Sequence, residues 1–234
     1  MIYPHGDIET VASDIFMVRG SIKMNAMLRI TRNMAIVRHN GELSLINPIR
    51  LNAKVEQALR DLGEVKHIIR LGCFHGVDDP YYVETFGAKH WSQTGGTAFT
   101  EPNIDNPLTD EAELPFSGGR LFLFKETKQP ECVLLMERDG GVLLTCDAIQ
   151  HYGDYSYNNI PARIIMPFIG FPRTTIVGPL WLKGMTPENG SLESEFRDLL
   201  KLSFDKLLSA HGTLLTTGAH AAVATAVENA YHKN

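Results

Sequence analysis

The chain has 234 residues, which is enough for one domain with a sizeable apolar core. Its content of 44% hydrophobic and 21% charged residues excludes a disordered or collagen-like chain. The net charge is −5 and no segment concentrates Lys and Arg, so we expect no nucleic-acid partner. No stretch holds the roughly 20 apolar residues that a membrane span requires, and we expect no membrane partner either.

The N-terminal residues and the cysteines predict a cytoplasmic protein. The first ten residues carry charged side chains and lack the apolar centre of a secretory signal. The three cysteines, Cys73, Cys132 and Cys146, form an odd set without a C-x-x-C spacing. Such a set argues against both a disulfide framework and a structural zinc knuckle. We expect a single domain over residues 1–234.

The first part of the chain predicts consecutive strands that lead into a helix. The strands are expected at residues 15–18, 26–31, 34–38 and 43–46. Asn40-Gly41, between the last two strands, is typical of a tight hairpin turn. From Leu51 to Leu62 apolar residues recur at helical spacing, which predicts an amphipathic helix that ends at Gly63. A buried strand is expected next, at 65–69.

The second part of the chain repeats this order after a long loop. The polar tract 92–119 has Gly and Pro but no periodicity, which predicts a surface loop over a pocket. Further strands are expected at 121–124, 132–136, 142–145 and 206–208, and helices at 192–200 and 219–230. Asp139-Gly140-Gly141 predicts a second hairpin. The pattern predicts an α/β (α+β) fold with helices outside a sheet core.

Polar side chains follow three of the predicted strands directly, at residues 73–79, at Asp147 with His151, and at His211. Imidazoles and carboxylates that converge from separate strand ends are what a metal-dependent hydrolase needs, because the ion lowers the pKa of water. Each residue also has an ordinary role, since Asp147 can cap a turn and Cys73 can be a small buried residue.

The order of these segments resembles the metallo-β-lactamase fold superfamily over most of the chain. The segment 41–48 looks like the family strand that usually ends in Asp-x-Gly, and 73–79 stands at the H-x-H-x-D-H position. The run Val142-Leu-Leu-Thr-Cys146-Asp147 looks like the strand that ends in Gly-Asp, and 204–212 looks like the segment that ends in a ligand His followed by Gly. The resemblance implies a four-layer αββα sandwich.

The family's H-x-H-x-D-H motif matches this chain only in part. With His75 at the second His, Cys73 takes the first His, and Val77 the Asp, which leaves Asp78 at the final His. A shift of one residue instead places Asp78 at the Asp and Asp79 at the final His, and both registers stay open.

The family's mid-chain His also has no counterpart here. Its position falls near Lys128, whose ammonium would repel a dication and pair with Asp147.

These matches imply a reduced metal centre. The resemblance assigns His75, Asp147 and His211 as ligands, with Cys73 or Asp79 as additional ones. One divalent transition metal, Zn or Fe, is expected, or none. In the same scheme His151 or Asp78 carries the proton.

Two functions follow from this site. The first is a metal-dependent hydrolase that acts on a small-molecule substrate. The second is a metal-free binding or interaction protein that uses the pocket under the 92–119 loop, and the replacements by Val77 and Lys128 motivate it.

Overall fold

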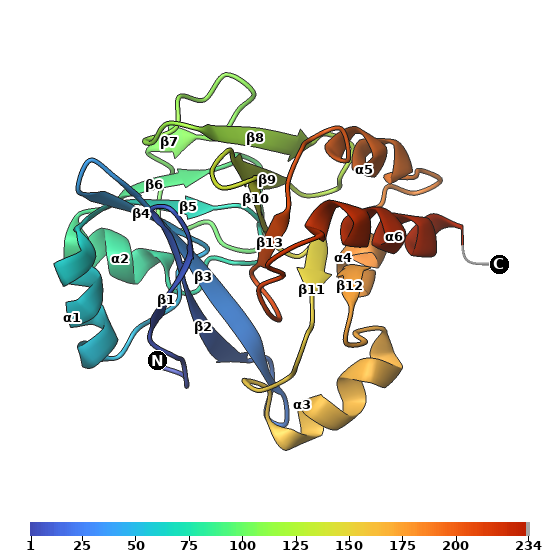
Figure 1. The fold of residues 1–234 in the computed structure, drawn as a ribbon, viewed down its shortest axis with the longest axis horizontal. Coiled ribbons are helices and arrows are strands. Elements are labelled where there is room, and N and C mark those ends of the chain that lie inside the picture. Colours follow the sequence, from blue (N-terminus) through green and yellow to red (C-terminus); the bar gives the residue numbers. More distant parts are fainter. Residues whose placement is uncertain (233–234) are drawn as a thin grey trace.

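Two β-sheets face each other, with helices on both outer sides (Figure 1). The computed structural model describes residues 1–232. The larger sheet has seven strands in chain order: β1 (Ile8–Ala12), β2 (Ile15–Lys23), β3 (Arg29–His39), β4 (Glu42–Ile46), β5 (Glu64–Arg70), β6 (Lys89–Ser92) and β7 (Asn106–Pro107). Strands β1 to β4 pair antiparallel, whereas β4 to β7 pair parallel.

Strand β3 corrects one expectation from the sequence. The predicted strands 26–31 and 34–38 merge into one strand that begins only at Arg29, because Arg32 and Asn33 continue the pairing with β2 between them. The hairpin at Asn40-Gly41 is confirmed, with φ of 51° and 82° at these residues. Such positive φ values match the turn that two-residue hairpins favour.

The smaller sheet has four strands in the order β13-β10-β9-β8. Their bounds are β8 (Gly119–Phe124), β9 (Glu131–Met136), β10 (Val142–Thr145) and β13 (Lys206–Ser209). Strand β13 runs parallel to β10, so both end at the same rim. A separate antiparallel pair, β11 (Ile149–His151) and β12 (Thr175–Val177), follows from this rim.

Helices cover the outer face of each sheet. The larger sheet packs against α1 (Ala53–Leu62) and α2 (Asp79–Phe86), and the smaller against α4 (Pro179–Met185), α5 (Glu193–Leu199) and α6 (Ala219–Tyr231). Helix α1 begins after Asn52, whose side chain accepts a hydrogen bond from the Val55 N–H, and ends at Gly63 as predicted. The 3₁₀ turn η1 (Met166–Ile169) follows helix α3 (Ile160–Ile165), and α3 projects beyond the sheets in Figure 1.

The main core lies between the two sheets. Inward residues such as Val37 and Ile69 of the larger sheet pack against Leu134 and Leu144 of the smaller. Separate apolar clusters join each sheet to its helices, which gives the four layers αββα. The predicted architecture is therefore confirmed. None of the helices within residues 1–232 is long and apolar enough to cross a bilayer.

Candidate metal centre

Three polar side chains meet where β5, β10 and β13 end. His75 lies in the loop after β5, Asp147 follows β10, and His211 follows β13. His75 Nε2 lies 3.1 Å from His211 Nε2 and 3.3 Å from Asp147 Oδ2, and His211 Nε2 lies 3.0 Å from Asp147 Oδ1. These are the three residues on which the sequence prediction depends most.

The His75–Asp147–His211 group is nearly closed to solvent. The histidines are only 5% and 7% exposed, and the Asp147 side chain is 16% exposed. Burial alone would raise the pKa of Asp147, but the adjacent imidazoles hold it below its ordinary value, so the carboxylate is ionised at pH 7. Burial lowers the pKa of His75, which keeps this imidazole neutral.

Strand β3 orients His211 from the opposite sheet. The Thr31 carbonyl accepts a hydrogen bond of 2.6 Å from His211 Nδ1, and the Thr31 hydroxyl accepts one of 2.8 Å from the Gly212 N–H. Because Nδ1 carries the proton, His211 directs its Nε2 lone pair into the group. Gly212 has a φ of 80°, and a Cβ there would lie 2.0 Å from the His151 carbonyl oxygen. Only glycine fits this position.

The His75–Asp147–His211 group brings hydrogen-bond acceptors face to face. With His211 Nδ1 protonated, a neutral His211 offers Nε2 only as an acceptor, yet Nε2 faces the Asp147 carboxylate, which is also only an acceptor. His75 Nδ1 is buried and has no hydrogen-bond partner within residues 1–232. A metal ion held by His211 Nε2 and the Asp147 carboxylate would give both acceptors a partner.

A buried glutamate that the sequence analysis did not select positions Asp147. Glu131 starts β9 and is fully buried. Its Oε1 accepts hydrogen bonds from the Asp147 and Ala148 N–H groups at 3.0 and 2.8 Å, and its Oε2 accepts one from Trp181 Nε1 at 2.8 Å. Burial and the neighbouring Asp147 raise the pKa of Glu131. The available signal was one acidic residue at the start of an otherwise apolar strand.

The three cysteines are all buried, and none belongs to the His75–Asp147–His211 group. Burial raises the pKa of the Cys73 thiol to about 12, so this thiol is protonated at pH 7. Cys73 lies outside the group, and its role as a ligand stays a prediction. Burial also raises the pKa values of Cys132 and Cys146.

Both aspartates of the loop after β5 pair with arginines and do not join the group. Asp78 lies 3.3 Å from Arg32, and the fully buried Asp79 lies 2.6 Å from Arg70 Nε. In the described structure each of these carboxylates has a guanidinium partner instead of a place in the group, and their roles as ligands stay predictions.

Two further predicted residues also lie outside the group. His151, in β11, has its Nδ1 2.8 Å from the Thr175 hydroxyl, and burial lowers the pKa of His151. Lys128 is exposed, and Asp147 pairs with the two imidazoles instead of with this ammonium. The expected Lys128–Asp147 ion pair is wrong, because the chain turns Lys128 toward solvent.

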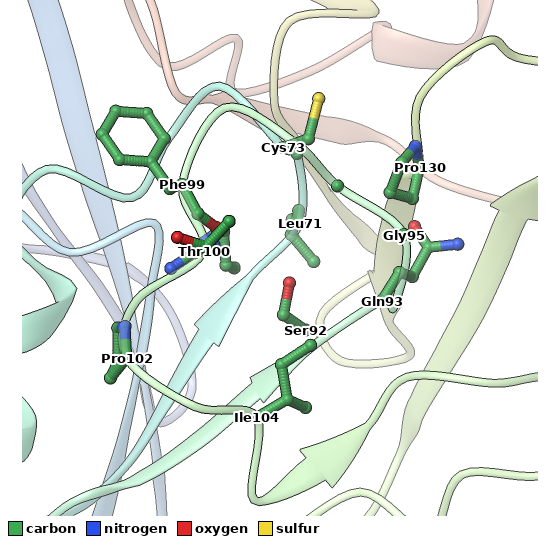
Figure 2. A pocket seen from close by; sticks show the side chains of 13 residues that line it. Leu71, Cys73, Ser92, Gln93, Gly95, Phe99, Thr100, Pro102, Ile104 and Pro130 are labelled. Atoms are coloured by element: carbon green, nitrogen blue, oxygen red, sulfur yellow. The ribbon is translucent and has the colours of Figure 1, made fainter.

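A cavity of about 160 Å³ lies under the predicted loop, next to the segment that leads to His75. Figure 2 shows the side chains that line it, which include Leu71, Cys73, Ser92, Phe99 and Ile104. Arg70 fixes the 92–119 loop, since its guanidinium donates hydrogen bonds to the Phe99 and Glu101 carbonyls at 2.8 and 2.9 Å. The cavity does not include the three grouped side chains.

No family model and no curated protein sequence matches the chain. Solved structures do match. The metallo-β-lactamase FIM-1 from Pseudomonas aeruginosa, in its mono-zinc form, is 9% identical with a TM-score of 0.66, and the alignment covers 99% of this chain and 98% of that one. A metallo-β-lactamase from Erythrobacter litoralis is 11% identical with a TM-score of 0.62, covering 100% and 96%.

A variant of the flavo di-iron protein from Thermotoga maritima is 16% identical with a TM-score of 0.66. The alignment covers 98% of this chain and 62% of that longer one. Identities this low carry information on the fold alone. With the four layers and the converging strand ends described above, they identify the chain as a divergent protein of the metallo-β-lactamase fold.

Proposed function

We propose that the protein is a hydrolase that uses one divalent metal ion, Zn or Fe, held by His75, Asp147 and His211. The observation that carries this proposal is the convergence of three side chains: the two Nε2 atoms lie 3.1 Å apart, His75 Nε2 lies 3.3 Å from Asp147 Oδ2, and His211 Nε2 lies 3.0 Å from Asp147 Oδ1. Neighbouring ligands of a tetrahedral zinc ion lie about 3.3 Å apart when the zinc–nitrogen bonds are about 2.0–2.1 Å long. Separations of this size support one ion held by all three side chains.

The number of protein ligands favours a catalytic site. Catalytic zinc sites use three protein ligands and leave a fourth position open, whereas structural sites use four. When bound, the ion supplies Lewis acidity that activates water and polarises a carbonyl or phosphoryl oxygen. Fold neighbours include a mono-zinc β-lactamase and a di-iron protein, which supports a metal of either kind.

The chain's own residues would supply binding, orientation and proton transfer. Thr31 fixes the His211 tautomer and Glu131 fixes the turn that presents Asp147. Of the two predicted proton carriers, His151 suits the role better, because Asp78 is held by Arg32. The backbone of His151 pairs with Gly212 beside the centre, and its lowered pKa leaves a neutral base at pH 7.

Elemental analysis tests this proposal. Untagged protein, purified without nickel resin or chelator, is measured before and after Zn or Fe is returned to a dialysed sample. We expect about one equivalent of metal, and we expect the H75A/H211A variant to lose it. The H39A/H232A variant, which removes two histidines outside the group, should keep it. Metal-loaded protein is then assayed on esters, thioesters and phosphoesters.

The cavity under the 92–119 loop favours a second candidate function, a metal-free ligand-binding protein. A volume of about 160 Å³ accommodates a ligand the size of a single aromatic ring. Protein that binds no Zn or Fe under any of these conditions would overturn the hydrolase proposal. Binding screens with small ligands, monitored by thermal stability, would then test the second candidate.

A further inference from the structure

Helix α3 and the turn η1 expose apolar side chains where a surface helix normally exposes polar ones. Their inner face is buried, because Ala162 and Met166 pack against Tyr152 and Phe171. Five large apolar residues point outward instead, with exposures of 41–85%: Ile160, Ile164, Ile165, Phe168 and Ile169. Exposed apolar patches of this kind mark surfaces that contact another molecule or a membrane.

Two neighbouring segments extend this surface. Met24 and Met27, at the tip of the β2–β3 hairpin, are 59% and 70% exposed, and Asn159 donates a hydrogen bond of 2.8 Å to the Met27 carbonyl. Leu180 of α4 is 65% exposed, and Pro179 beside it approaches Gly170 at the end of η1. We call these eight residues the α3 patch. They are eight of the thirteen exposed large hydrophobic residues within 1–232.

The segments that carry the α3 patch contain basic residues and no acidic ones. Residues 155–187 contain Arg163, Arg173 and Lys183 but no Asp or Glu, although the whole chain has a net charge of −5. The hairpin residues 19–29 likewise contain three cations and no acid. The basic rim of the patch thus contrasts with the acidic protein as a whole.

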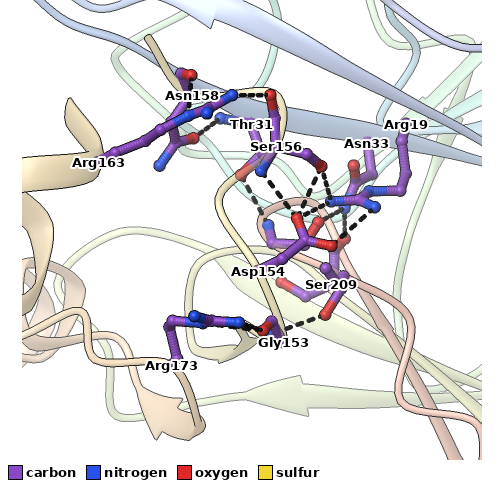
Figure 3. Close-up of polar contacts among 12 residues, drawn as sticks. Arg19, Thr31, Asn33, Gly153, Asp154, Ser156, Asn158, Arg163, Arg173 and Ser209 are labelled. Atoms are coloured by element: carbon purple, nitrogen blue, oxygen red, sulfur yellow. Dashed lines mark hydrogen bonds and ion pairs between the residues drawn. The ribbon is translucent and has the colours of Figure 1, made fainter. Parts of the chain in front are cut away.

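Two arginines of this rim donate to backbone carbonyls (Figure 3). Arg163 donates to the Ser156 and Asn158 carbonyls at 2.6 and 2.9 Å, and Arg173 donates to the Gly153 carbonyl at 2.9 and 3.0 Å. Within residues 1–232 no carboxylate pairs with either. The nearby Asp154 pairs with Arg19 at 2.8 Å.

We propose that the α3 patch docks on the surface of a membrane that contains anionic phospholipids. The apolar side chains would enter the boundary between headgroups and acyl chains, and the basic rim would contact the phosphates. Docking of this kind needs no spanning helix, so the lack of a span in the sequence does not oppose it. A second copy of the chain is a poorer occupant, because a symmetric contact would bring the positive rims face to face.

Sedimentation with vesicles tests the proposal on the full chain. The vesicles are phosphatidylcholine alone or phosphatidylcholine with about 30% phosphatidylserine. We expect binding to the anionic vesicles that weakens as salt rises from about 0.1 M to about 1 M, where screening shortens from about 10 Å to about 3 Å. Binding that is equal on both vesicle types, or absent from both, would overturn the proposal.

Paired variants separate the apolar and the charged contributions. F168S/I164S should lower the partition coefficient about tenfold or more, whereas F74S/V77S, which changes exposed apolar residues elsewhere, should not. R173Q/K183Q should weaken vesicle binding and make it less dependent on salt. The control K54Q/K89Q, which changes lysines of α1 and β6, should leave both unchanged. Because Ile164 and Phe168 are exposed, circular dichroism should show unchanged folding. Self-association that F168S/I164S abolishes, without vesicle binding, would assign the α3 patch to a second copy.

Discussion

Single residues around the centre fix the backbone by hydrogen bonds to its N–H and carbonyl groups, and Glu131 is the clearest case. Its carboxylate is the acceptor for three buried N–H groups that come from a turn and from helix α4. Its loss would leave these donors without partners, and each buried unsatisfied donor costs about 1–3 kcal/mol. The side chain therefore ties the position of Asp147 to the packing of the smaller sheet against its helices.

We predict that E131A lowers the free energy of unfolding by about 3 kcal/mol or more, since three donors lose their acceptor. E131Q should cost less, because the amide oxygen can still accept from the Asp147 and Ala148 N–H groups. Urea unfolding followed by circular dichroism measures both. The exposed Glu126, in the same loop, gives the matched control E126Q, which should behave like wild type. Equal stability of E131A and E126Q would contradict the role assigned to Glu131.

At the scale of elements, regular strands and long amphipathic helices are predictable from local pattern. Alternating and apolar runs located β4, β5, β9, β10 and β13, and helix α1 follows its periodicity from its cap to Gly63. Strands β6, β11 and β12 were not located. They have three or four residues each, and β6 and β11 are largely polar, whereas the equally short β10 is apolar over its first three residues. Strand β3 was divided because Arg32 and Asn33 interrupt its apolar run, and both are buried by contacts with distant segments.

The turn after β13 has a geometry that only glycine permits, and this gives a second prediction. G212A should destabilise the protein by several kcal/mol, because a Cβ would meet the His151 carbonyl at 2.0 Å. Gly41 provides the matched control. It has a similar φ of 82° with no atom within 4 Å of the added Cβ, so G41A should cost only about 1–2 kcal/mol. Thermal unfolding of the two variants compares the costs, and equal melting temperatures would contradict this account.

At the scale of the whole molecule, the three residues of the candidate site were more predictable than the contacts of the residues around them. Strand order and the family resemblance pointed to His75, Asp147 and His211, which the structure brings together, because side chains at strand ends keep their place in the chain order. The pairing of Asp78 with Arg32 was not predictable, since Arg32 lies in β3, 46 residues earlier in the chain. Sequence spacing does not report contacts between elements that are far apart in the chain.

Buried histidines predict how stability depends on pH. Burial lowers the pKa values of His67, His75, His90 and His151, so these imidazoles stay neutral in the fold while the unfolded chain takes up protons below about pH 6.5. Each one therefore destabilises the fold as the pH decreases from 7.5 to 5, by at most about 1.4 kcal/mol per pH unit. The raised pKa values of Asp79 and Glu131 act in the opposite direction.

Comparison of wild type with a single variant isolates the contribution of His67 to the pH dependence. His67 Nδ1 accepts a hydrogen bond of 3.0 Å from Trp91 Nε1, which a glutamine oxygen can also accept. We predict that the stability of wild type relative to H67Q decreases between pH 7.5 and pH 5, measured by urea unfolding at each pH. Parallel curves for the two proteins would show that His67 does not titrate differently on folding.

The burial of all three cysteines has a practical consequence for chemical labelling. Thiolates react with maleimides, and the native thiols are both enclosed and protonated at neutral pH. A cysteine introduced at an exposed position would therefore be the dominant site of modification in the otherwise unaltered chain. An environment-sensitive fluorophore attached in this way at position 168 would report the polarity that surrounds η1, without removal of any native cysteine.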